Sequence, residues 1–99
     1  MSKLVLLVAL AACKSHEPAT HQVTIQGMQF QPASLTAAVG DTVVWTNKDI
    51  VPHTVTDKGV FDSQSLASQQ AWKHTFDTPG QYEYGCTFHP TMTATIIVQ

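Results

Sequence analysis

The sequence contains no arginine, and its five lysines are outnumbered by seven acidic residues, for a formal charge of −2. Nucleic-acid binding depends on clustered basic side chains, so this charge balance excludes it. Charged residues are only 12% of the chain against 43% apolar residues, which excludes an intrinsically disordered protein and a coiled coil. Helical periodicity over ten or more residues is absent beyond the leader. The 99 residues therefore predict one small domain without long helices.

Only two cysteines are present, Cys13 and Cys86, and they lie in very different surroundings. Lys3 precedes an unbroken apolar run over residues 4–12, which is too short to span a bilayer and fits a short secretory signal. Residues 10–13, Leu-Ala-Ala-Cys, resemble the lipobox of bacterial lipoproteins, which implies cleavage before Cys13 and acylation of that cysteine. A signal in which Cys13 is incidental and a disulfide between the two cysteines are the alternatives.

These features divide the chain into three predicted parts: a signal peptide over residues 1–12, a tether over residues 13–21 and a folded domain over residues 22–99. The expected location is the bacterial periplasm, with an acylated Cys13 as the one contact with the membrane. The tether is polar and unpatterned, so its His16 and the neighbouring His21 are expected to be solvated.

From Val23 onward, short stretches of alternating apolar and polar residues are separated by turn residues, which is the pattern of half-buried strands. In one of these stretches Val43 and Trp45 are expected to face the core. Residues 30–32, Phe-Gln-Pro, are expected to interrupt strand pairing. The expected strands cover residues 23–27, 34–39, 41–47, 55–56, 60–61, 71–76, 81–86 and 93–98. About seven or eight short strands predict an all-β fold, a Greek-key β-sandwich.

The stretch Cys-Thr-Phe-His-Pro-Thr-Met, from Cys86 to Met92, places a thiolate, an imidazole and a thioether within seven positions. Two histidines and one cysteine with a distant axial methionine form the ligand set of a blue copper site. The loop offers His89 together with Cys86 and Met92, so the second histidine must come from elsewhere. His53 is the best candidate, because the preceding Pro52 stiffens its segment.

Several motifs extend this pattern over almost the whole range of residues 22–99. They are Phe30-x-Pro32, Gly40-Asp41-Thr42-Val43-x-Trp45-x-Asn47, Pro52-His53-x-Val55, Phe76-x-x-Pro79-Gly80-x-Tyr82-x-Tyr84 and Cys86-Thr87-x-His89-Pro90-x-Met92. With them the chain resembles the cupredoxins, the type I copper proteins of the plastocyanin, pseudoazurin and amicyanin group. Its loop spacing is most similar to amicyanin. The resemblance implies one copper ion, with His53, Cys86 and His89 as equatorial ligands and Met92 as the axial ligand.

The resemblance also implies the function, which is one-electron transfer between redox partners through Cu(II) and Cu(I). No enzymatic activity is expected, because four protein ligands leave no coordination position for a substrate. An extracytoplasmic copper carrier or buffer is the alternative, although methionine is scarce for such a protein. Zinc is a less suitable metal because methionine is a poor ligand for it. A plain interaction domain would leave the ligand spacing unexplained.

Three further residues are expected to support the ligands. The family usually carries asparagine after the first ligand histidine, and this chain carries Thr54. The backbone N–H at that position is expected to bond the cysteine sulfur, while the shorter threonine side chain makes only part of the link between the ligand loops. Asn47 and Thr87 are candidates for the remaining hydrogen bonds.

The loop histidine is expected to lie near the surface, where its ring edge would be the port for electrons. An apolar collar around such a port suits brief encounters with a redox protein, because it desolvates quickly. The expected port consists of His89, Phe88, Pro90 and Pro52. The partners are therefore expected to be redox proteins that dock transiently around His89, with this chain itself a monomer.

Overall fold

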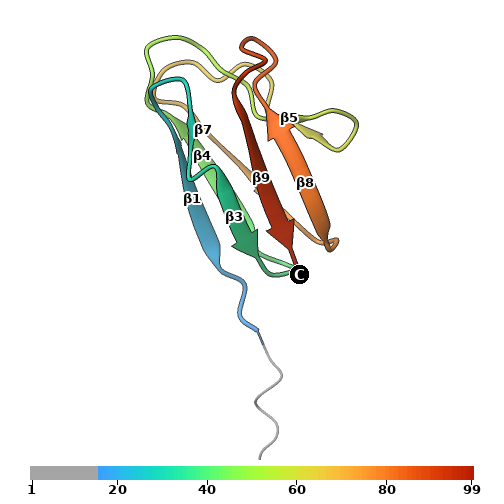
Figure 1. Cartoon of the computed structure of the whole chain (residues 1–99). Helices are drawn as coiled ribbons and strands as arrows, with labels where there is room; N and C mark the ends of the chain where they lie inside the picture. The colour runs from blue at the N-terminus through green and yellow to red at the C-terminus, as the bar shows by residue number, and fades with distance from the viewer. Residues whose placement is uncertain (1–15) are drawn as a thin grey trace, which may run out of the picture.

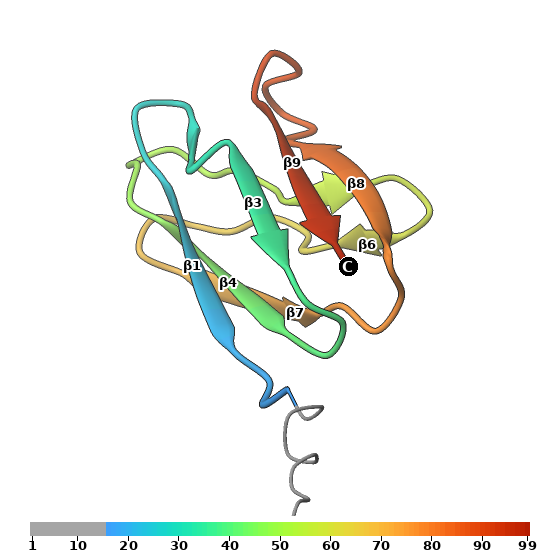
Figure 2. The ribbon, with the colours of Figure 1, turned by 60° about the horizontal axis from the view of Figure 1, so that its bottom comes forward.

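The computed structural model describes residues 16–99, which form two β-sheets packed face to face (Figures 1 and 2). The predicted signal peptide and Cys13 lie outside the described residues. The described part contains nine strands and no helix, and so nothing helical that could cross a membrane. The strands are β1 (Thr20–Ile25), β2 (Phe30–Gln31), β3 (Ser34–Ala37), β4 (Thr42–Asn47), β5 (Thr56–Asp57), β6 (Phe61–Asp62), β7 (Ala71–Thr75), β8 (Gly80–Gly85) and β9 (Thr93–Val98).

One sheet has the strand order β2-β1-β4-β7, and the other has the order β3-β9-β8-β5-β6. The pairs β1–β4 and β3–β9 are parallel, and the remaining neighbours are antiparallel, so both sheets are mixed. The predicted all-β sandwich is confirmed. The ninth strand is β2, which has only two residues, too few to produce a visible alternation.

Two local expectations differ from the structure. The segment expected to interrupt pairing contains β2, which pairs with β1 through Thr24 with Gln31 and Ile25 with Phe30, so that prediction is wrong. Pro32 comes directly after this short ladder, where its missing N–H removes no ladder bond. Strand β1 begins at Thr20, before the expected start of the domain, because it lies beside β4 from Thr42 onward.

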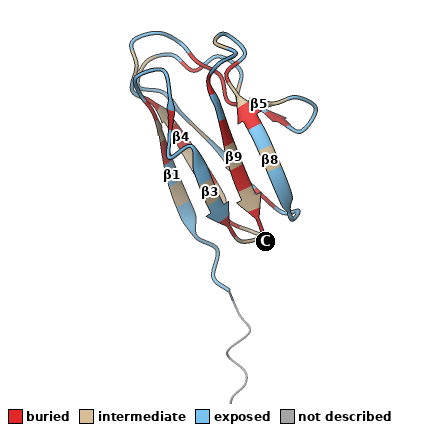
Figure 3. Cartoon of the chain, in the orientation of Figure 1, coloured by how far each residue is buried: buried red, intermediate tan, exposed pale blue. Residues whose placement is uncertain are grey.

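The core lies between the sheets, and Figure 3 shows buried residues alternating with less buried ones along the strands. In β4 the side chains of Val43, Trp45 and Asn47 are buried, as the alternation requires. Trp45 is completely buried, which confirms its predicted place in the core. Asn47 is buried on the same face although it is polar, and its side-chain amide bonds backbone groups of Val51, Leu66 and Asp49.

A hydrogen bond links the two sheets at the centre of the core. The Nε1–H of Trp45 donates to the hydroxyl oxygen of Tyr84 over 3.0 Å, and the two rings meet edge to face with centroids 5.5 Å apart. Phe30 packs against the same tyrosine ring in a second edge-to-face contact, at 4.8 Å. Aromatic pairs in this arrangement are favourable beyond the area that they bury. Tyr84 therefore joins the β8 strand, which leads into the Cys86 loop, to the opposite sheet.

Replacing Tyr84 with phenylalanine should lower the free energy of unfolding by about 1–3 kcal/mol, because the buried indole N–H of Trp45 loses its acceptor. Urea unfolding followed by tryptophan fluorescence measures the change. The matched control is Tyr82→Phe, which removes a hydroxyl that donates to the carbonyl of Thr78 at an exposed position. Water can replace that bond, so the control should cost less. Equal losses in both variants would contradict the central role of the buried bond.

Asp41 forms a second polar cluster, in the turn between β3 and β4. Its carboxylate accepts the backbone N–H groups of Ala19 and Ala38 and contacts the rings of His16 and His21, at 2.8–2.9 Å. The two histidines therefore bind Asp41, and the expectation that both are simply solvated is wrong. No local pattern indicates these contacts, because the carboxylate lies 20 or more positions further along the chain. The cluster fixes the entry of the chain into β1.

These hydrogen bonds hold the pKa of the Asp41 carboxyl well below its usual range; the bond from Ala19 contributes most, followed by those from His16, His21 and Ala38. A carboxyl group whose pKa is lower in the folded than in the unfolded protein stabilises the folded state. This stabilisation is complete above the pKa of the unfolded state, which is about 4. We expect the free energy of unfolding to fall as the pH is lowered below that value. In Asp41→Asn the fall should be shallower and the stability at pH 7 lower. Urea midpoints between pH 2 and pH 7 test this, and identical profiles would contradict it.

The two ends of the sandwich have different roles. The C-terminus and the Asp41 turn lie at the end where the N-terminal segment enters (Figure 1). The β4–β5 and β8–β9 connections lie together at the opposite end, and these connections carry the predicted ligand residues.

Candidate metal centre

The β8–β9 connection is wound by three backbone hydrogen bonds. The N–H of His89 donates to the carbonyl of Cys86 over 3.2 Å, and the N–H of Met92 donates to the carbonyl of His89 over 2.9 Å. The N–H of Cys86 closes the loop on the carbonyl of Met92 over 3.2 Å. The spacing of three residues between the candidate ligands therefore coincides with two successive turns. Each turn begins and ends at a ligand residue, which fixes the backbone of all three.

His53 reaches the same place from the β4–β5 connection. A pair of backbone hydrogen bonds with Leu66, at 3.1 and 2.8 Å, holds His53 as an isolated bridge outside the named strands. The imidazole is completely buried, whereas His89 is only half-buried. Asn47 holds the segment around His53 in place, because its Nδ2 donates to the carbonyls of Val51 and Leu66 at 2.9 and 3.0 Å.

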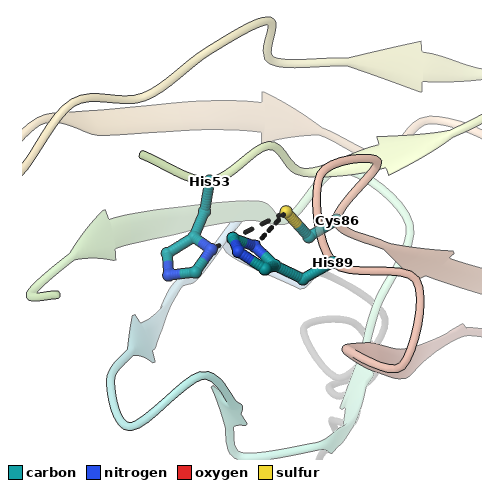
Figure 4. Close-up of side chains that lie close together, drawn as sticks. All are labelled: His53, Cys86 and His89. Carbon is teal, nitrogen blue, oxygen red and sulfur yellow. Dashed lines mark hydrogen bonds between the residues drawn. The ribbon is translucent and has the colours of Figure 1, made fainter. Parts of the chain in front are cut away.

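The three side chains converge on one point (Figure 4). The Sγ atom of Cys86 lies 3.7 Å from Nδ1 of His53 and 3.7 Å from Nδ1 of His89, and the potential ligand atoms all lie within 4.8 Å of one another. A metal with bonds of about 2.3 Å to sulfur and about 2.0 Å to nitrogen, at angles of about 120°, would separate those atoms by about 3.7 Å. The two sulfur–nitrogen separations therefore fit a single metal ion bound by the cysteine and both histidines. Cys86 is a buried free thiol.

Met92 completes the loop as a buried residue, 3% exposed, directly before β9. It belongs to the same apolar cluster as Cys86. A thioether is a soft donor, and a weak axial thioether beside two imidazoles and a thiolate is the combination typical of blue copper sites. The donor types and the apolar surroundings fit copper better than zinc, for which methionine is a poor ligand.

Thr54 connects the two ligand segments. Its backbone N–H donates to the Sγ atom of Cys86 over 3.3 Å, and its hydroxyl accepts the backbone N–H of Thr87 over 2.9 Å. The hydroxyls of Thr54 and Thr87 also lie 3.2 Å apart, within hydrogen-bond distance. The threonine therefore makes both the sulfur contact and a direct link between the loops. Asn47 contacts neither sulfur nor imidazole and acts on the backbone before and after His53.

Asp49 is a residue of this site that the sequence analysis missed. Its Oδ2 lies 2.8 Å from Nε2 of His53, the ring nitrogen that faces away from Cys86. Burial works to raise the pKa of Asp49, but hydrogen bonds from His53, Met28 and Gly27 outweigh it, so the pKa lies below its ordinary value. The spacing of four residues before His53 was a possible signal. It carries little weight alone, because acidic residues are common in exposed loops.

The surface around His89 is apolar. Phe88 is 51% exposed, and both Pro90 and Pro52 are exposed beside the half-buried His89. Other exposed apolar side chains of the connections at this end are those of Met28, Ile50 and Val51. Single exposed apolar residues are ordinary, and a group of them at one end of a small domain is a candidate interaction surface. The residues expected to form the port are thus accessible to a partner.

Comparison with known proteins gives a consistent result. The family model for the cupredoxin-like domain matches residues 2–98. The chain is 35% identical over 83 residues to amicyanin from Paracoccus versutus, a match that covers 78% of this chain and 63% of that protein. It therefore spans slightly less than two thirds of that relative's length.

Solved structures are similar as well. An oxidised variant of amicyanin has a TM-score of 0.75 at 33% identity, and the match covers 80% of this chain and 81% of that one. A copper-containing nitrite reductase from Thermus scotoductus has a TM-score of 0.77 at 28% identity, and the match covers 92% of this chain but only 25% of the reductase.

Proposed function

The chain belongs to the cupredoxin-like family, and we propose that it is a small type I copper protein that carries single electrons between redox partners. One observation carries the proposal: a buried cysteine sulfur and two imidazoles lie together at separations suited to one metal ion, with methionine in the same loop. Bound copper would supply the Cu(II)/Cu(I) couple, held by His53, Cys86 and His89 with Met92 as the axial ligand.

The protein's contribution is a fixed arrangement of donors. Cys86, His89 and Met92 are held by turn hydrogen bonds, and His53 is held by its bridge to Leu66. Such a site changes little when one electron is gained or lost, because the backbone, and not the metal's preferred geometry, sets the positions of the donors. Burial of Cys86 and His53 keeps water away from them. Thr54, Thr87 and Asn47 are proposed to maintain these positions through the hydrogen bonds described above.

Electrons are proposed to enter and leave through the exposed edge of His89. Phe88, Pro90 and Pro52 form an apolar collar around it and are suited to transient docking with a redox protein. The similarity to amicyanin supports the electron-carrier role that the family resemblance implies. The nitrite reductase is about four times as long as the region that it shares with this chain, so its chemistry is not carried over.

The remaining parts of the proposal concern the setting of the protein. We propose export to the periplasm with residues 1–12 as the signal and residues 22–99 as the copper-binding domain, joined by residues 13–21, of which Thr20 and His21 already belong to β1. Acylation of Cys13 would attach the otherwise monomeric domain to the membrane. Mass spectrometry of the protein isolated from membranes tests the acylation directly, because a lipid on Cys13 adds its mass to the mature N-terminus.

The test of function is to add Cu(II) to the purified protein and record its visible spectrum. A thiolate ligand predicts an intense charge-transfer band, and a colourless or weakly absorbing complex would overturn the proposal. Stopped-flow exchange with a small redox couple then separates an electron carrier from a copper buffer. A carrier should exchange electrons rapidly while keeping its metal, whereas a buffer should release Cu(I) to a chelator.

A further inference from the structure

The carboxylate of Asp49 is fixed from two directions. On one side it lies 2.8 Å from Nε2 of His53. On the other it accepts the backbone N–H groups of Gly27 and Met28, at 2.8 and 3.0 Å, in the turn between β1 and β2. Both turn residues have positive φ, +64° and +60°, which points consecutive N–H groups at the same anion. The backbone N–H of Asp49 is itself bound by Oδ1 of Asn47, over 2.9 Å.

This contact decides which nitrogen of His53 carries the proton. A carboxylate can only accept hydrogen bonds, so Nε2 must donate, and in the neutral imidazole Nδ1 is then the nitrogen with a free lone pair. Nδ1 is the atom that lies 3.7 Å from Cys86 Sγ. The imidazole is completely buried, and the Asp49 side chain is only 15% exposed, so water competes little for this bond. The ring is therefore prepared for a metal by a partner on its far side.

The contact also brings a negative charge close to the proposed metal position. Asp49 contacts the imidazole of His53, one of the proposed ligands. Asp57 in β5 is a partly exposed carboxylate without a hydrogen bond to any of the proposed ligands. A carboxylate bonded to the outer nitrogen of an imidazole makes the ring a stronger donor. A stronger donor and a nearby anion both favour the metal ion with the higher positive charge.

We propose that Asp49 is a positioning residue that fixes the tautomer of His53 and lowers the reduction potential of the bound copper. The part of the inference that concerns the reduction potential rests on the proposed function. The part that concerns the tautomer applies to the metal-free protein as well. The β1–β2 turn contributes to this positioning, because its N–H groups keep the Asp49 carboxylate in place when no metal is bound.

The first experiment needs no copper. Nitrogen-15 NMR of the metal-free protein at neutral pH should show a single tautomer of His53, with the proton on Nε2. The variant Asp49→Ala should lose this preference and show exchange between the two tautomers. A wild-type His53 that is protonated on Nδ1, or an unchanged tautomer in Asp49→Ala, would overturn the proposal. Urea unfolding of each variant verifies that it is folded under the conditions used.

The second experiment compares Asp49→Asn with Asp57→Asn in the copper-loaded protein. Each variant loses one negative charge, but only the first loses it from a ligand contact. Asp49→Asn should weaken Cu(II) relative to Cu(I) by about tenfold, which is a potential increase of about 59 mV for one electron. The shift in Asp57→Asn should be much smaller, because exposed charges are screened by water and salt.

The outcomes separate the two proposals. Equal shifts in the two variants would mean that only the overall charge matters and would overturn the role of Asp49. Absence of the intense band from the wild-type protein would overturn the copper function, while the NMR experiment would still decide whether Asp49 positions His53. A shift confined to Asp49→Asn, together with a single wild-type tautomer, supports both parts of the inference.

Discussion

Replacing Cys86 with serine should abolish the intense visible absorption of the copper-loaded protein. The absorption requires a thiolate bound to copper, and serine provides a hydroxyl that remains protonated and is a hard, weak donor. The described part of the chain contains no second cysteine that could take its place. Losing an outer hydrogen-bond partner typically costs about 10–100-fold in metal affinity, so loss of this central ligand should cost more than that.

Titration with Cu(II), followed by visible absorption and by competition with a chelator, measures both quantities. Serine is close to cysteine in size, so the buried position should remain filled and the fold should persist, as circular dichroism can show. Thr91→Ala is the matched control in the same loop, because Thr91 is exposed and lies between His89 and Met92. The control should keep the band at full strength. A band that survives in the serine variant would exclude Cys86 as the sulfur ligand.

Replacing Gly85 with alanine should cause the second large effect, although Gly85 is not a proposed ligand. A Cβ atom at this position would lie 2.6 Å from the backbone oxygen of Met92, and backbone at both ends of the contact cannot move aside cheaply. The same oxygen accepts the N–H of Cys86 that closes the loop. The loop must therefore open between residue 85 and the Met92 carbonyl, which moves Cys86 and Met92 apart.

We expect Gly85→Ala to reduce the free energy of unfolding by about 3 kcal/mol, at the upper end of typical overpacking costs. For a domain of this size that change lowers the melting temperature by roughly 15 °C. The visible band should also shift or weaken, because the distances between the ligands change. Thermal unfolding and absorption spectra of the same samples measure both effects.

Gly59→Ala separates the clash from the general cost of removing a glycine. Gly59 has φ +82° and nothing within 4 Å of a built Cβ, so alanine there is strained but does not collide. Its cost should be about 1 kcal/mol, with an unchanged band. If the two alanine variants lose the same stability and both keep the wild-type spectrum, the contact with Met92 does not control the loop.

The sequence predicted the fold class because residues such as Val43 and Trp45 alternate with polar neighbours, and a period of two indicates strands directly. Strand β2 could not be predicted in this way. It consists of Phe30 and Gln31 alone, and its pairing depends on β1 lying beside it. The contacts of His16 and His21 with Asp41 were missed for a similar reason, since a polar segment gives no sign of a distant carboxylate.

The candidate site likewise contains residues that local spacing predicts and residues that only the fold brings together. Cys86, His89 and Met92 were identified from the sequence because local turns bring together residues three apart, so spacing alone carries the information. His53 was chosen because Pro52 precedes it, and the family resemblance implied the same residue; its distance of 3.7 Å from Cys86 depends on two connections at the same end of the sandwich. No local rule relates residues 33 positions apart.

The sequence by itself determined the chemistry of this protein: which donor atoms are present, that three of them share one loop, and that short strands build the frame. Only the tertiary structure decided how those donors are supported. It joined Thr54 to Cys86 and Thr87, and it placed Asp49 behind His53 on the two N–H groups of the β1–β2 turn. The physical reason is that ligand type is a property of single residues, whereas hydrogen-bond partners across loops exist only after the sheets have brought distant segments together.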